Sequence, residues 1–68
     1  MDDDTFNMQT RKFLKKVGIN AQRAIDTAVR DAIGSGQLSG NEVLNASVTL
    51  KVDGVDIEVT IDDTIALE

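Results

Sequence analysis

The sequence predicts a single α+β domain, with two N-terminal helices followed by a C-terminal antiparallel β-hairpin. Apolar residues recur every three or four positions in the first half, which is typical of amphipathic helices. From Ala46 onward they alternate with polar residues, which is typical of strands. The Asp53-Gly54 pair between two alternating runs is a strong signal for a tight hairpin turn. A chain of 68 residues is enough for one domain, which we assign to residues 1–68.

The first helix is predicted over residues 5–17. Thr5 is a good N-cap, and the three aspartates before it suit the positive end of a helix. Gly18 can adopt the left-handed conformation that ends a helix, with Ile19 as the apolar partner of that cap. The positions that share one face are Phe6, Thr10, Phe13, Leu14 and Val17.

The second helix is predicted over residues 20–33, with Asn20 as its N-cap. It is amphipathic and has many small residues on its apolar face, so that a partner can approach closely. The residues of that face are Ala21, Ile25, Ala28, Val29, Ala32 and Ile33. A connector rich in glycine and serine follows, from Gly34 to Asn41.

The hairpin strands are predicted over residues 46–52 and 55–61. A two-residue turn would pair Val52 with Val55 and would place all the apolar side chains on one face. The Asp62-Asp63 pair resembles a second turn, after which residues 64–67 could either add a short third strand or pack against the core.

The segment from Leu14 to Ile25 resembles a DNA-binding helix-turn-helix, for which the hairpin would supply a wing. The helix from Asn20 to Ile33 would then enter the major groove. Two observations argue against nucleic acid as a partner. Leu14 stands where the motif has a small residue, and the net charge of the chain is −5. The residues that would contact DNA in this alternative are Gln22, Arg23 and Asp26.

A cluster of four cations in the first helix is the other candidate binding surface. It consists of Arg11, Lys12, Lys15 and Lys16. This cluster could hold RNA, phosphate or an acidic partner. The alternative is a solvated face that complements the helix dipole in the last turn and attracts the acidic second half of the chain.

The composition argues against an enzyme, a cofactor and a metal site. The chain has no His, Cys or Tyr, so the usual general bases, nucleophiles and zinc ligands are missing. The carboxylates near the hairpin do not have the spacing of a calcium-binding loop. They are Asp53, Asp56, Glu58, Asp62 and Asp63. The acidic start is unlike a signal peptide, and no apolar run has membrane-spanning length, so we expect a cytoplasmic protein with no membrane contact.

These observations favour a small non-enzymatic interaction or structural module that self-associates, with an unidentified protein partner as a further expectation. A domain of this size needs extra stabilisation, and disulfides are excluded. An isolated two-stranded hairpin is also marginal in water. We therefore expect a homodimer, in which the strand from Val55 to Ile61 pairs with its own copy. A second route to a dimer is that the flexible connector from Gly34 to Asn41 lets the hairpin of one chain dock on the helices of the other.

Taken over nearly its full length, the chain resembles a family of short, chiefly proteobacterial proteins classed as a domain of unknown function. The residues that carry the resemblance are Asp4-Thr5-Phe6-Asn7-Met8, Arg11-Lys12-Phe13-Leu14-Lys15-Lys16-Val17-Gly18, Ala28-Val29-Arg30, Gly40-Asn41-Glu42 and Asp53-Gly54. The resemblance implies a stand-alone bacterial domain and brings no activity or binding site with it.

Overall fold

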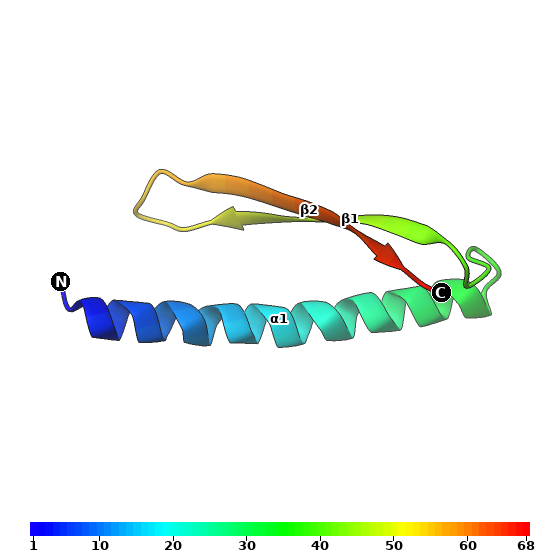
Figure 1. Cartoon of the computed structure of the whole chain (residues 1–68), viewed down its shortest axis with the longest axis horizontal. Coiled ribbons are helices and arrows are strands. Elements are labelled where there is room, and N and C mark those ends of the chain that lie inside the picture. Colours follow the sequence, from blue (N-terminus) through cyan, green and yellow to red (C-terminus); the bar gives the residue numbers. More distant parts are fainter. The chain divides into compact units, whose positions relative to one another are not determined.

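A computed structural model describes all 68 residues as one long helix and one antiparallel hairpin (Figure 1). The elements are α1 (Asp3–Gly34), β1 (Val43–Lys51) and β2 (Glu58–Ala66). The α+β class is confirmed, whereas the predictions of two helices and of a third strand are wrong. The chain divides into two compact units, a helical unit of Met1–Gln37 and a hairpin unit of Leu38–Glu68.

The predicted corner at Gly18 is absent, because α1 continues through it as 32 unbroken helical residues. Asn20 does not cap a second helix; its side-chain amide donates a hydrogen bond to the Lys16 carbonyl oxygen at 2.7 Å. A helical glycine costs only about 1 kcal/mol relative to alanine. Val17 and Ala21 lie four residues apart, on the same face, so the amphipathic pattern runs across Gly18 without a break.

Both ends of α1 are capped. The N-cap is Asp2 and not Thr5, because the Asp2 carboxylate accepts a hydrogen bond from the Thr5 N–H at 3.1 Å. At the other end, the N–H of Gly36 donates to the Ile33 carbonyl at 3.2 Å, and the N–H of Gln37 donates to the Ala32 carbonyl at 2.9 Å. This pair of bonds is a Schellman motif, which needs the positive φ of 84° that Gly36 adopts.

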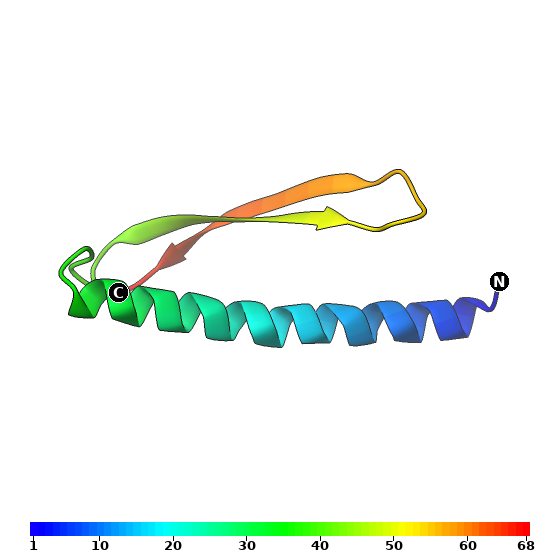
Figure 2. The same ribbon diagram turned by 180° about the vertical axis from the view of Figure 1, so that it is seen from behind.

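The hairpin strands pair two residues out from the predicted register. Leu50 lies opposite Val59, and the turn spans residues 52–57 with Gly54 at φ 93°. The predicted two-residue turn is therefore wrong, but an even shift keeps the apolar side chains together on one face. The observed register places Lys51 opposite Glu58, with 4.0 Å between Nζ and Oε1. Figure 2 shows the two strands as a twisted ribbon.

The predicted turn at Asp62-Asp63 is also wrong, because both aspartates lie inside β2. The strand continues past them, and Ile65 pairs with Leu44 in the early part of β1. Aspartate is disfavoured in strands, which is why this pair resembled a turn. The alternation of Val59 and Ile61 extends to Ile65, and this continuity prevails over the local preference of the aspartates.

No residue of the chain is buried. Large apolar side chains remain open to solvent in both units, with 54% of Phe6, 51% of Phe13 and 64% of Ile61 exposed. Each unit is therefore ordered in its backbone hydrogen bonds but encloses no hydrophobic core.

Candidate functional site

The continuous helix joins most of the two predicted helix faces into one surface, which we call the apolar stripe; Val29 and Ile33 of the second predicted face fall outside it, and Ala24 is added to it. Its members are Phe6, Thr10, Phe13, Leu14, Val17, Ala21, Ala24, Ile25, Ala28 and Ala32. Phe6, Val17 and Ala28 are spaced by eleven residues, and so are Thr10 and Ala21. Eleven residues make three turns at 3.67 residues per turn, which is close to the period of a straight helix. The stripe therefore stays on one side of α1 along its whole length.

All four residues of the predicted basic cluster lie in the first half of α1 and are exposed. The expectation that they complement the helix dipole in a last turn is wrong, since the helix ends about five turns after Lys16. They form two like-charge pairs at i, i+4 spacing, Arg11 with Lys15 and Lys12 with Lys16, and such pairs destabilise a helix by a few tenths of a kcal/mol. The ion pairs in the structure are Arg30–Asp26 at 3.0 Å and Lys51–Glu58, so none of the four cations is paired.

The residues of the DNA-binding alternative lie in the middle of α1 and do not head a separate helix. Gln22, Arg23 and Asp26 are exposed, and the Asp26 carboxylate accepts a hydrogen bond from Arg30 Nε at 3.0 Å. A helix-turn-helix needs a turn between its two helices, and α1 has none at Gly18.

The hairpin has one apolar face and one polar face, because neighbouring residues in a strand point to opposite sides. The apolar face comprises Leu44, Ala46, Val48, Leu50, Val59, Ile61 and Ile65. Asp63 also lies in this row, opposite Ala46. On the polar face, the hydroxyl oxygens of Thr49 and Thr60 lie 3.2 Å apart in a cross-strand hydrogen bond.

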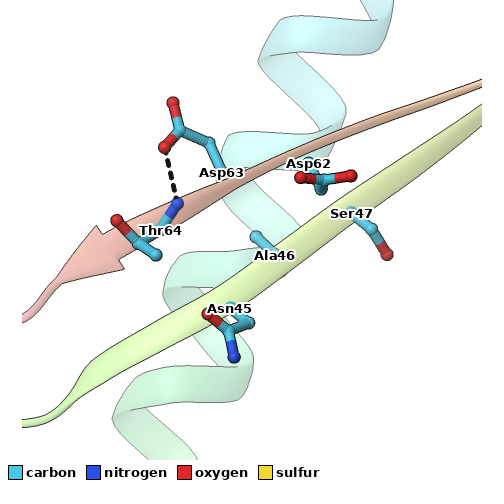
Figure 3. Close-up of a pocket in the computed structure, with 6 residues that line it drawn as sticks. All are labelled: Asn45, Ala46, Ser47, Asp62, Asp63 and Thr64. Carbon is cyan, nitrogen blue, oxygen red and sulfur yellow. Dashed lines mark hydrogen bonds between the residues drawn. The ribbon is translucent and has the colours of Figure 1, made fainter.

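A shallow hollow lies on the hairpin, between the early part of β1 and the late part of β2 (Figure 3). Its lining residues are Asn45, Ala46, Ser47, Asp62, Asp63 and Thr64. These side chains point to both faces of the ribbon and do not converge on one point. The Asp63 carboxylate accepts a hydrogen bond from the Thr64 N–H at 2.8 Å. No group of three or more Asp, Glu, His or Cys residues in the chain is placed to hold a metal ion.

The loop before β1 is organised by Glu42, which sequence reasoning missed. Its carboxylate accepts hydrogen bonds from the backbone N–H groups of Ser39 at 2.7 Å, Gly40 at 2.8 Å and Asn41 at 3.1 Å. The bonds from Ser39 and Gly40 hold the pKa of Glu42 below its ordinary value, because they stabilise the charged form. The backbone oxygen of Glu42 also accepts from Leu67 N–H at 3.0 Å, which links this loop to the end of the chain.

Acid is expected to loosen this loop. Because the pKa of Glu42 is lowered in the folded chain, its contribution is complete above the pKa of a free glutamate, about 4.3. That contribution is lost as the pH falls through the lowered value. Amide hydrogen exchange at Ser39 and Gly40, measured by NMR, should accelerate over this range once corrected for the intrinsic rate. Glu42→Gln should loosen the loop already at neutral pH, whereas Glu58→Gln should not. Unchanged protection of Ser39 and Gly40 in Glu42→Gln at neutral pH would contradict the assignment.

The comparisons with known proteins agree with the resemblance found in the sequence. A family model described as "Family of unknown function (DUF6494)" matches residues 1–68. The chain belongs to this family. The DUF6494 match covers both the helical unit and the hairpin unit, so the two occur together in the family's pattern. No curated protein and no solved structure shows significant similarity to the chain.

The length of α1 raises the question of whether this helix of the DUF6494 chain could cross a membrane. Although α1 has 32 residues, its charged residues recur along its length. No helix in the structure combines the length and the apolar character needed to cross a membrane.

Proposed function

We propose that the chain is a non-enzymatic protein-interaction module that works as a homodimer in the bacterial cytoplasm. The observation that supports this proposal is that no residue is buried, although 41% of the residues are hydrophobic. Ordering a chain costs about 1 to 2 kcal/mol of backbone entropy per residue, and buried apolar surface is the main compensation. A chain without a core lacks this compensation until another surface covers it.

Each unit separately supports this reasoning. Helices in proteins gain most of their stability from packing an amphipathic face, and α1 leaves about half of Phe6, Phe13 and Leu14 exposed. A two-stranded hairpin is marginal in water without a cover, and the hairpin leaves 49% of Val48 and 43% of Val59 exposed. A second copy of the chain is always present with the first, and it can cover this apolar surface through a self-complementary two-fold interface.

The dimer has two candidate surfaces, the apolar stripe of α1 and the outer edge of β2. The strand predicted to pair with its own copy runs from Val55 to Ile61, but β2 begins at Glu58, so part of that segment belongs to the turn. Pairing β2 with its own copy would also bring the carboxylates of Glu58, Asp62 and Asp63 close to those of the other copy. The apolar stripe contains no charged residue, and it is therefore the surface that we favour.

Sedimentation equilibrium at micromolar concentration and moderate salt tests the proposal. The expected mass is twice the 7.3 kDa of one chain. The midpoint of thermal unfolding should rise with protein concentration, since a dimer is stabilised by mass action. A mass of 7.3 kDa together with a cooperative melt that is independent of concentration would contradict the homodimer.

A further inference from the structure

We propose that two copies pair through their apolar stripes with the two α1 helices antiparallel, about a two-fold axis near residue 19. This inference rests on the proposed homodimer and specifies how it is built. In this arrangement, the numbers of two facing residues add up to 38. The first reason is an uneven distribution of side-chain size along the stripe. Its first half carries the large residues Phe6, Phe13, Leu14 and Val17, whereas four of the members of its second half are alanines.

An antiparallel pair places most of the large side chains opposite small ones, the exception being Phe13, which faces Ile25. Phe6 of one copy then faces Ala32 of the other, Leu14 faces Ala24, and Val17 faces Ala21. Each such contact occurs twice, because a two-fold axis makes the pairing reciprocal. A parallel pair would place phenylalanine against phenylalanine at one end and alanine against alanine at the other. Since the distance between helix axes depends on the side chains at the contact, parallel helices would splay apart.

The charges of α1 give a second, independent reason. In a parallel pair, the four cations at residues 11–16 of one copy would lie beside the same four cations of the other. In the antiparallel pair they lie beside residues 22–27, where Arg23 and Asp26 cancel. Likewise, the aspartates at residues 2–4 lie beside residues 34–36, which carry no charge. The opposed helix dipoles favour the antiparallel arrangement as well.

The geometry of the stripe allows this pairing along nearly the whole helix. From Phe6 to Ala32 the stripe is about 39 Å long at 1.5 Å per residue. Because its eleven-residue spacing is close to the period of a straight helix, the two stripes remain in contact without strong supercoiling.

Distances between spin labels in the dimer test the orientation. The chain has no cysteine, so single variants can be labelled uniquely. In the antiparallel dimer, the two labels of Thr5→Cys lie about 42 Å apart along the helix axes, since 28 residues separate their levels. In a parallel dimer they lie at the same level, about 10 Å apart plus the reach of the label arms. Ile19→Cys is the matched control, because its two labels lie at the same level along the helix axes in either orientation, and both positions are exposed.

A long distance for Thr5→Cys with a short one for Ile19→Cys supports the antiparallel pair. Short distances for both variants overturn it in favour of a parallel pair, and long distances for both show that the helices do not pair at residue 19. In these two cases a dimer mass in sedimentation leaves the homodimer intact. A mass of 7.3 kDa, with no distance between labels, removes the homodimer itself and the orientation with it.

Discussion

Replacing Ala21 with aspartate is expected to separate the two copies and to abolish most of the helical circular dichroism signal. Ala21 is a partly covered residue of the apolar stripe, close to its midpoint. In the proposed dimer an aspartate there would be desolvated against Val17 of the other copy, and an unpaired buried charge is very costly. We expect the dissociation constant to rise by a factor of about 100 or more, which corresponds to about 2.7 kcal/mol. Sedimentation equilibrium measures the dissociation constant.

The matched control is Gln22→Asp, which adds the same charge one residue further along. Gln22 is exposed and does not belong to the apolar stripe. Its variant should keep the dimer mass and the helical signal. If both variants dissociate to the same extent, net charge and not the stripe controls association; if neither dissociates, the stripe is not the interface.

The Gly18→Pro variant should lose about 3 kcal/mol or more of stability. Proline removes a backbone N–H from the helical hydrogen bonds, and its ring clashes with the preceding turn. Gly18 lies near the middle of α1, so the damage cannot be limited to a frayed end. Urea unfolding, followed by circular dichroism at a fixed protein concentration, measures the loss.

The Gly18→Ala variant distinguishes one long helix from two. No atom lies within 4 Å of the position that a Cβ on Gly18 would take, and the residue is helical, so alanine should stabilise the chain by about 1 kcal/mol. A glycine that ends a helix in the left-handed conformation behaves in the opposite way. Gly36→Ala, at φ 84°, should therefore destabilise the chain. If Gly18→Ala instead destabilises the chain, the result would support two helices that meet in a corner at Gly18.

The sequence was sufficient to predict the class of each segment, because periodicity reflects which side chains share a face. The 3.6-residue period indicated helix on both sides of Gly18, and the two-residue period indicated strands on both sides of Gly54. The errors arose where one or two residues suggested a boundary. Gly18 and Asn20 have the chemistry of a cap, yet ending the helix there would sacrifice backbone hydrogen bonds and interrupt the apolar stripe. The Asp62-Asp63 pair was misread for the same reason.

The candidate surfaces were only partly predictable. Arg11, Lys12, Lys15 and Lys16 could be found from composition alone, but their lack of ion-pair partners required coordinates. The apolar stripe could be recognised as one continuous surface only once α1 was known to continue through Gly18. The role of Glu42 depends on three consecutive N–H groups pointing at one carboxylate, and this arrangement follows from the loop backbone, with Gly40 at φ 103°. No residue pattern in the sequence indicates such a geometry.

The aspartate in the apolar row of the hairpin is expected to oppose stacking of this segment into fibrils. A short hairpin with open edges and a row of Val59, Ile61 and Ile65 has the features of a segment that stacks into fibrils. In-register stacking would place the Asp63 carboxylates of successive copies about 4.8 Å apart within an otherwise dry row. Their repulsion, together with the cost of removing them from water, disfavours each added layer. We therefore expect Asp63 to act as a gatekeeper, which weakens the apolar face slightly in one molecule and disfavours the stacking of many copies through that face.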